Sequence, residues 1–202
     1  MNYLLVDTSG AHLSVVVAFN GKTEYIFEPD CGVNHSVKIT TAIEQTLEKA
    51  GATLFSLDFI GAVVGAGSFT GIRIGVSAVK GLCLAAEKPA LKITSFDTIA
   101  YNKDSGKVMA VIDAGHNGYY ICGYEDKKVV IPPRFISGDD LKKISEGFSL
   151  LSFVEIKGLK TEIVSPLTGL IKFAEENGDK ITSDVNCLTP VYCRKSQAEE
   201  GR

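Results

Sequence analysis

Short apolar runs separated by polar turns fill the beginning of the chain. Residues 3–6, 13–19 and 23–27 are three such runs, and the Asn20-Gly21 pair between the last two is typical of a two-residue hairpin turn. The turn after the first run reads Asp-Thr-Ser-Gly, residues 7–10. We therefore predict three strands joined by tight turns at the start of the chain.

The apolar spacing then changes to that of alternating helices and strands. Apolar residues recur at helical spacing within residues 36–50, and Gly51 supplies a stop. The same pattern predicts strands at residues 59–64 and 91–94, a helix at 72–86, and a helix at 95–101 that Ser95 caps.

The opening pattern restarts in the middle of the chain. Residues 104–107 resemble a linker, and the apolar run that follows again ends in an aspartate, Asp113. When Asp7 is placed on Asp113, Val6 falls on Ile112 and apolar residues follow both turns. This weak repeat predicts a duplicated βββα unit that forms two similar lobes. The predicted lobes are residues 1–102 and a smaller one, residues 103–202. The other predicted elements are strands at 109–112, 119–124, 129–131 and 150–156, helices at 139–145 and 167–176, and a solvated tail at 196–202.

Composition narrows the class of protein. The 202 residues are 45% hydrophobic and 22% charged, which is ordinary for a globular protein with a buried core and excludes disordered and coiled-coil chains. The net charge of −3 argues against an autonomous nucleic-acid binder. The five cysteines form no Cys-x-x-Cys pair, which favours reduced thiols. The N-terminus does not resemble a signal peptide, and residues 72–86 are short for a membrane span and contain Arg73 and Lys80. We expect a cytoplasmic protein without a membrane contact.

Two glycine-containing turns are candidate sites. Asp7, Thr8 and Ser9 form either a phosphate-binding turn, in which the aspartate holds a hydrated Mg²⁺, or an ordinary Asx turn. Residues 65–71, Gly-Ala-Gly-Ser-Phe-Thr-Gly, follow a strand and open a helix, where glycines permit positive φ and the close approach of another backbone. A dinucleotide site fits this loop poorly because no acidic residue ends the next strand, and a phosphate-binding P-loop needs a Gly-Lys-Ser/Thr ending that is absent.

The helix at 72–86 is apolar on nearly every face. Such a helix is buried on more than one side, either inside the protein or against a partner. One stripe at helical spacing is formed by Arg73, Ser77, Lys80 and Leu84. The three histidines, His12, His35 and His116, match no metal-ligand spacing, and we expect His35 to cap the first helix or lie in an interface. No nucleophile motif is present, so we expect neither a metal nor a catalytic centre.

Residues 65–75, Gly-Ala-Gly-Ser-Phe-Thr-Gly-Ile-Arg-Ile-Gly, closely resemble the motif of the TsaB family, also called YeaZ, with Ala66 where the family has a proline. The motif loop of this resemblance consists of Gly65, Gly67, Ser68, Phe69, Thr70 and Gly71. Further similarity lies in residues 5–9, in Asn34-His35-Ser36, in Pro190-Val191-Tyr192 with Arg194, and in Ala198-Glu199. The turn from Asp113 to Tyr120 departs from the family's pattern, which leaves its role open.

The resemblance implies an actin-like (ASKHA) fold of two lobes and a non-catalytic subunit in the synthesis of threonylcarbamoyladenosine in tRNA. It implies binding and activation of the paralogue TsaD, which performs the transfer, and contact with the ATPase TsaE. It also implies a homodimer when TsaD is absent, and contact with tRNA only through the complex. Neither the His-x-x-x-His metal site nor the adenosine pocket of TsaD is present, so Asp7, Thr8 and Ser9 would be a vestigial phosphate turn and no cofactor is expected.

The candidate partner interface combines two helix stripes, Val37, Thr40 and Glu44 with Arg73, Ser77, Lys80 and Leu84. Two alternatives remain open. One is an independent actin-like ATPase or small-molecule kinase, which Asp7, Thr8 and Ser9 would serve. The other is a metal-dependent glycoprotease, which the missing metal-ligand set disfavours.

Overall fold

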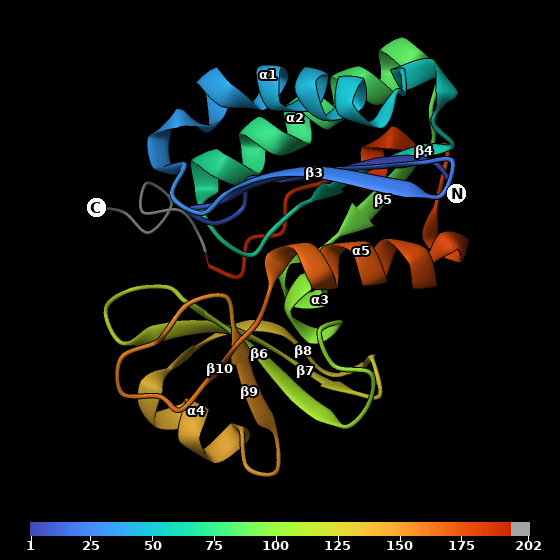
Figure 1. Ribbon diagram of the computed structural model, residues 1–202. Coiled ribbons are helices and arrows are strands. Elements are labelled where there is room, and N and C mark those ends of the chain that lie inside the picture. Colours follow the sequence, from blue (N-terminus) through green and yellow to red (C-terminus); the bar gives the residue numbers. More distant parts are fainter. Residues whose placement is uncertain (195–202) are drawn as a thin grey trace.

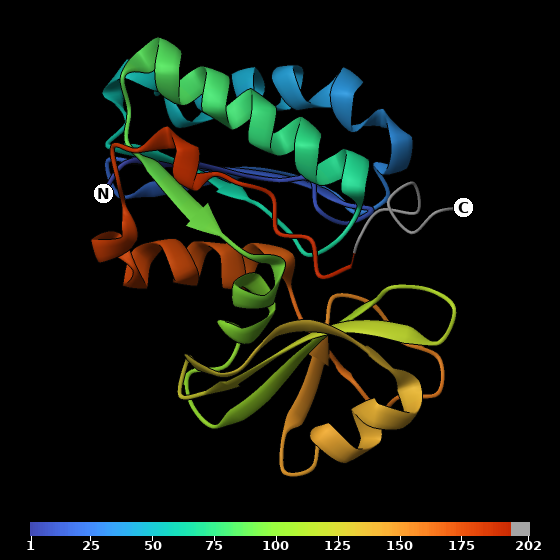
Figure 2. The same ribbon diagram turned by 180° about the vertical axis from the view of Figure 1, so that it is seen from behind.

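A computed structural model describes residues 1–194 of the chain, and the predicted tail at 196–202 and the Ala198-Glu199 pair lie outside this part. Two five-stranded sheets are stacked along the long axis of the molecule with helices around and between them (Figures 1 and 2). Helices α1 (His35–Ala50) and α2 (Phe69–Ala86) cover the outer face of the first sheet. Helices α3 (Ser95–Ala100) and α5 (Pro166–Glu176) lie between the two sheets, and α4 (Gly138–Ile144) covers the second sheet from outside.

The two sheets have the same topology. The first has the order β3-β2-β1-β4-β5, and the second, β10-β9-β6-β7-β8, is the same order in reverse. In both, the first three strands in sequence pair antiparallel and the last two are added in parallel. The strands are β1 Tyr3–Asp7, β2 Leu13–Phe19, β3 Lys22–Glu28, β4 Phe59–Val63, β5 Ala90–Ile93, β6 Lys107–Asp113, β7 Gly118–Glu125, β8 Lys128–Ser137, β9 Ser149–Ser152 and β10 Glu162–Ile163.

The repeat that starts at Asp7 and Asp113 therefore corresponds to a repeated structure, and the α/β class with two similar sheets is confirmed. The second copy is reduced. Its helix after the third strand, α4, has 7 residues where α1 has 16, and in the described residues no helix separates β9 from β10. The division of lobes at residues 102 and 103 stays a prediction.

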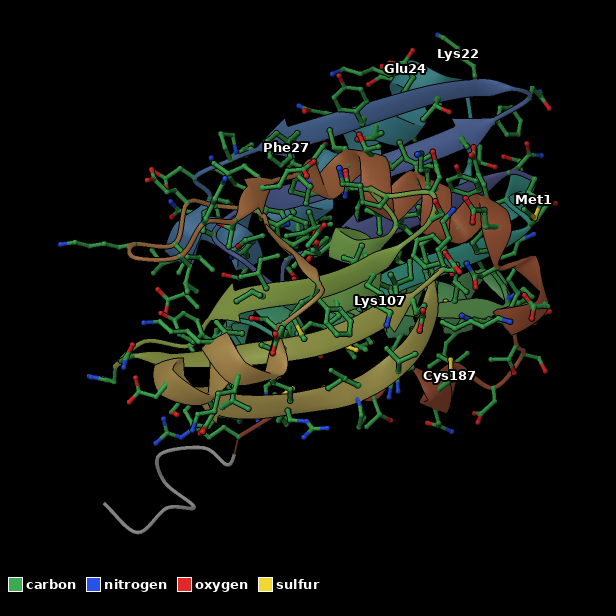
Figure 3. The ribbon with its side chains drawn as sticks, turned by 90° about the horizontal axis from the view of Figure 1, so that it is seen from below. Met1, Lys22, Glu24, Phe27, Lys107 and Cys187 are labelled. Atoms are coloured by element: carbon green, nitrogen blue, oxygen red, sulfur yellow. The ribbon has the colours of Figure 1, made fainter. Side chains whose placement is uncertain are left out.

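The hydrophobic core consists of separate clusters that lie between the sheets and the helices packed on them. One cluster joins the outer face of the first sheet to α1 and α2, and includes Leu4, Val15, Ile43, Ile72 and Val79. A second joins the other face of that sheet to α5, and a third joins α3 to the second sheet. Seen from below, the polar side chains of the edge strand β3, such as Lys22 and Glu24, lie along one rim of the molecule (Figure 3). These two side chains form an ion pair of 2.9 Å, in which Lys22 is exposed and Glu24 is half-buried.

Most predicted elements are confirmed, with four corrections. Helix α2 begins at Phe69 and not at residue 72, because Ser68 is its N-cap and accepts from the Gly71 N–H. The N-cap of α3 is Thr94 and not Ser95, since the Thr94 side chain accepts from the Asp97 N–H in a capping box. Strand β8 continues through Pro132 and Pro133 because it is an edge strand, where a missing N–H is tolerated. Strand β9 ends at Ser152, since pairing with β6 extends only to Leu151.

Helix α2 has 18 residues and by length and composition alone could cross a membrane. The helix predicted at 72–86 was too short for this. The buried residues of α2 face the first sheet, and core helices of globular proteins pass the same test. One side of α2, including Arg73, Ser77 and Leu84, is exposed, so the helix is not covered on every face within this chain.

Candidate functional site

The turn after β1 holds a buried ion pair. Asp7 is 0% exposed, and its Oδ2 lies 3.0 Å from Nε2 of His12, which is 6% exposed. Its Oδ1 accepts from the Ser9 N–H at 2.8 Å, so both carboxylate oxygens are used. His12 also contacts both lobes, with its ring edge-on to Phe153 at 5.4 Å and tilted against Phe27 at 6.0 Å.

Burial and pairing act in opposite directions on these two groups. Burial alone would raise the pKa of the Asp7 carboxyl, but the His12 imidazolium and the hydrogen bonds from Ser9 hold that pKa below its ordinary value. Burial alone would lower the pKa of His12, but the Asp7 carboxylate raises it. The geometry therefore favours a carboxylate paired with a protonated imidazole.

This pairing predicts a pH dependence of stability. The pKa of His12 is raised in the folded protein above the ordinary value of 6.5. The contribution of His12 to the free energy of unfolding is therefore complete below pH 6.5 and is lost as the pH rises through the folded pKa. The pKa of Asp7 is lowered from 3.8, so its contribution is complete above pH 3.8 and is lost as the pH falls through the folded pKa. We expect the stability difference between the natural protein and His12→Gln, measured by urea unfolding, to be largest between pH 3.8 and pH 6.5. A difference that grows above pH 7 would contradict the pairing.

The glycines of the motif loop allow that loop and α2 to pack directly on the turn. A Cβ at Gly67 would collide with the Ser9 carbonyl oxygen, and one at Gly71 with the Thr8 carbonyl oxygen. The Ser68 N–H donates to the Ser9 carbonyl at 2.7 Å, and the Thr8 hydroxyl donates to the Gly71 carbonyl at 2.7 Å. The predicted close approach of another backbone is therefore confirmed, and the backbone it approaches is that of the turn.

Actin-like folds imply a nucleotide with Mg²⁺ at this turn, and the residues present do not fit that group. Thr8 and Ser9 are buried, and the Ser9 hydroxyl is hydrogen-bonded to the Ser95 hydroxyl at 2.9 Å. The Ser9 N–H points at Asp7 and its carbonyl is occupied by Ser68. His12 supplies the positive charge that a cation would bring to Asp7. The Asp7 carboxylate, the Thr8 and Ser9 hydroxyls and the Ser9 N–H are thus all engaged within the protein, unlike the open donors of a phosphate loop.

The equivalent turn of the second lobe is open. The Asp113 Oδ1 accepts from the Gly115 N–H at 2.8 Å, the same Asx bond that Asp7 makes, yet Asp113 is exposed. Between the two turns lies a pocket of about 510 Å³, with Phe27, Phe153 and Tyr120 among its aromatic lining and Ser9, Ser95 and Ser152 among its hydroxyls.

The candidate interface residues lie on the accessible side of the helix layer. Val37 is 76% exposed and Leu84 is 69% exposed, although both are large apolar side chains. Thr40, Glu44 and Ser77 are also exposed, and Lys80 is half-buried. Arg73 is engaged within its own chain, since its guanidinium lies 3.8 Å from the Phe69 ring centre and its Nε donates to the Tyr192 hydroxyl at 3.0 Å. Their role as an interface stays a prediction.

Sequence reasoning missed the partner of Asp7 and the role of His35. His12 follows Asp7 by five residues across a turn, and no helical or metal-ligand spacing marks such a pair. His35 is buried at the start of α1 and its Nε2 bonds the His12 carbonyl at 2.9 Å, so it joins α1 to the turn and lies in no accessible interface. Among the described residues no group of three or more His, Cys, Asp or Glu is arranged to hold a metal ion.

Two sheets of matching topology, each with an aspartate at the end of its first strand, define an actin-like α/β protein of two lobes. Residues 29–153 match the model of the family described as TsaD: tRNA N6-adenosine threonylcarbamoyltransferase. The chain belongs to this family, and its resemblance to the TsaB (YeaZ) members is confirmed by the relatives described next.

Three relatives illustrate the similarity. The tRNA threonylcarbamoyladenosine biosynthesis protein TsaB of Escherichia coli is 31% identical over 129 residues, 62% of this chain and 55% of that protein. The matched part is thus about half of that relative's length. TsaB of Bacillus subtilis is 25% identical, and the match covers 98% of this chain and 96% of that protein. The solved structure of YeaZ from Pseudomonas aeruginosa has a TM-score of 0.75 at 22% identity, covers 95% of this chain and 99% of its own, and supports the fold.

Proposed function

We propose that this protein takes part in tRNA threonylcarbamoyladenosine biosynthesis as a non-catalytic subunit that binds and activates a TsaD-type transferase. Membership of the TsaD family and similarity to proteins named for this pathway support the pathway. The buried turn supports the non-catalytic role, because the Asp7 carboxylate is already paired with His12. We also propose that it acts in the cytoplasm, without a cofactor, and that TsaE binds the assembled pair.

The observation that carries the proposal is the exposure of two large apolar side chains, Val37 on α1 and Leu84 on α2. Val37 is 76% exposed and Leu84 is 69% exposed, and covering one such side chain with a partner is worth about 1.5–3 kcal/mol. Both helices cover the outer face of the first sheet (Figure 1). Equivalent helices of a TsaD paralogue, or of a second copy when TsaD is absent, would cover these two side chains. Burial of this surface would favour one TsaD conformation.

Leu84→Glu tests the proposal. We expect the mixed species with TsaD, seen by light scattering on a sizing column, to weaken at least 10-fold, because a carboxylate would replace an apolar side chain that the partner covers. Ile163→Glu is the matched control, since Ile163 is 61% exposed on β10 in the other lobe. If Leu84→Glu binds TsaD as the natural protein does, this face is not the interface.

The ATPase alternative makes a different prediction. An independent actin-like ATPase or kinase would show steady ATP turnover without partners. Under the proposed function, the purified protein shows no turnover above background. Turnover that disappears in Asp7→Asn would replace the scaffold proposal with the enzyme.

A further inference from the structure

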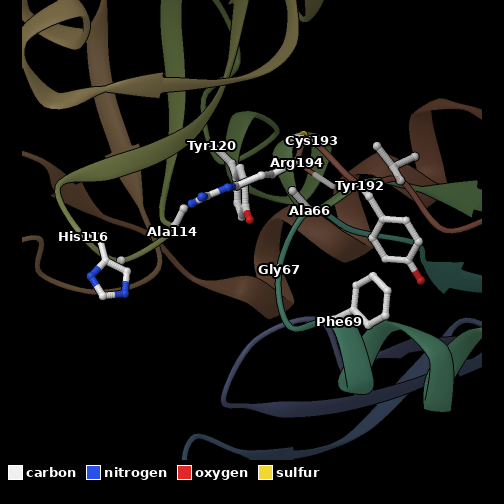
Figure 4. Close-up of a pocket in the computed structure, with 11 residues that line it drawn as sticks. Ala66, Gly67, Phe69, Ala114, His116, Tyr120, Tyr192, Cys193 and Arg194 are labelled. Atoms are coloured by element: carbon white, nitrogen blue, oxygen red, sulfur yellow. The ribbon is translucent and has the colours of Figure 1, made fainter. Parts of the chain in front are cut away.

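The outer edges of the two sheets differ in how they are protected. Edge strand β5 is partly covered by the C-terminal segment, because Ala90 and Thr182 exchange two backbone hydrogen bonds, of 2.7 and 3.0 Å. Further along, this segment is held by Tyr192, whose ring stacks on Phe69 at the pocket shown in Figure 4. Edge strand β10 has only 2 residues, and edge strand β8 contains two consecutive prolines and register shifts. These three edges are therefore poor templates for another strand.

Strand β3 is the open edge. Its 7 residues include no proline, and its register with β2 runs without a bulge from the Phe19–Lys22 pair to the Leu13–Glu28 pair. In the described part of the chain it pairs with no strand other than β2, and it lies along the outer rim of the molecule (Figure 3). A regular edge of this length can accept one further strand by backbone hydrogen bonding.

The hairpin turn determines which backbone groups of β3 face outward. Its two residues have φ of 49° and 77°, as in a type I′ turn, and the residues that flank such a turn, Phe19 and Lys22, are a hydrogen-bonded pair. Bonded and non-bonded pairs alternate along antiparallel strands. The N–H and C=O groups that point away from β2 are therefore those of Thr23, Tyr25 and Phe27.

The side chains of β3 add charge and apolar surface to this edge. Tyr25 is 54% exposed and Phe27 is 36% exposed, and both lie on the same face as Thr23 because side chains alternate along a strand. On the other face, Ile26 packs against the core, and Lys22 and Glu28 stand at the two ends of the strand. Opposite charges at its two ends make the strand complementary to its own reverse.

We propose that β3 pairs with β3 of a second copy of this chain, antiparallel and centred on Tyr25, so that two five-stranded sheets join into one. In this register Tyr25 lies opposite Tyr25 and Thr23 opposite Phe27 of the second copy, so all the outward backbone groups are hydrogen-bonded. Lys22 lies opposite Glu28 of the second copy, and two-fold symmetry forms this pair twice. Opposite charges directly across two strands stabilise their pairing.

The order of charges distinguishes this register from its neighbours. With the centre moved to Glu24, two Glu24 side chains face each other, and with the centre moved to Ile26, Glu24 faces Glu28. Like charges in such positions are destabilising. An unrelated peptide would have to carry the reversed order of charges, which a second copy supplies by symmetry. The pairing uses neither α2 nor Leu84, so the inference goes beyond the proposed function and does not rest on it.

The first test measures the dissociation constant of the dimer by sedimentation velocity over a series of concentrations. It uses the full chain with Leu84→Glu, which removes the helix contact of the proposed function. Tyr25→Pro deletes the outward N–H and leaves the bonds to β2, because proline is tolerated at an edge where its nitrogen faces away from the sheet. We expect roughly 5- to 150-fold weaker pairing, the range for two lost hydrogen bonds. Tyr25→Phe keeps the N–H and should pair as its parent does.

A charge exchange tests whether the occupant is a second copy. We expect Lys22→Glu and Glu28→Lys each to weaken the dimer by roughly 2- to 30-fold, the range for two lost charge pairs, and an equimolar mixture of the two variants to restore it. Restoration requires one strand from each variant, which no unrelated partner provides. Lys142→Glu, at an exposed position on α4, is the matched control and should leave the dimer unchanged.

Three results would overturn the proposal. They are a Leu84→Glu protein that is monomeric at every concentration, unchanged pairing by Tyr25→Pro, and a mixture of the two charge variants that pairs no better than either alone. Thermal unfolding of each variant separates a lost contact from a lost fold. Binding of TsaD by Tyr25→Pro in the chain that retains Leu84 tests the proposed function separately, because the helix face is intact in that variant.

Discussion

Replacing His12 with asparagine is expected to lower the free energy of unfolding by about 3–5 kcal/mol at neutral pH. The Asp7 carboxylate is 0% exposed, and without the imidazolium it would be a buried charge with no opposite partner. Removal of one member of a buried pair costs this much mainly because the other charge remains in a medium of low polarity.

A double-mutant cycle measures the pairing itself. Asp7→Asn keeps an oxygen that accepts from the Ser9 N–H and removes the charge, so the double variant Asp7→Asn/His12→Asn contains no unpaired ion. We expect a coupling free energy of about 1–3 kcal/mol from urea unfolding of the four proteins, with the double variant more stable than the sum of the single effects. Additive effects would mean that the two groups do not interact.

Gly71→Ala is expected to destabilise the protein by roughly 3 kcal/mol, although alanine is a better helix former than glycine. The added Cβ would collide with the Thr8 carbonyl oxygen. That oxygen belongs to the backbone and the position of a Cβ is fixed by the backbone of residue 71, so neither atom can rotate away. Helix α2 or the turn must move, and the hydrogen bond from the Thr8 hydroxyl to the Gly71 carbonyl would be lost with it.

Gly81→Ala is the matched control because Gly81 lies in the same helix and a Cβ there would meet nothing within 4 Å. We expect this variant to be stabilised by about 0.5–1 kcal/mol, the difference in helix propensity. Thermal unfolding of the two variants side by side measures both effects. A Gly71→Ala protein as stable as Gly81→Ala would show that the loop does not pack tightly on the turn.

Local patterns in the sequence predicted the elements well and predicted the site only in part. Gly51 ends α1 with a φ of 66° as expected, and the strands around Asn20-Gly21 form the expected hairpin. The glycines of the motif loop indicated a close contact, but not that Thr8 and Ser9 would be the partners, since that depends on the parallel pairing of β1 with β4. Neither the buried pair of Asp7 and His12 nor the stack of Phe69 on Tyr192 follows from a periodicity.

The return of α5 to the first sheet has a consequence during synthesis of the chain on the ribosome. Tyr3, Leu5 and Phe59 are covered on one side by Leu170 and Phe173, and the Tyr3 hydroxyl donates to Glu175 at 3.4 Å across 172 positions in sequence. Thr182 pairs with Ala90, and the Val191 N–H donates to the Val64 carbonyl at 2.8 Å. The nascent N-terminal sheet therefore exposes an apolar face until α5 has left the exit tunnel, and a chaperone that shields such faces would be needed most in that interval.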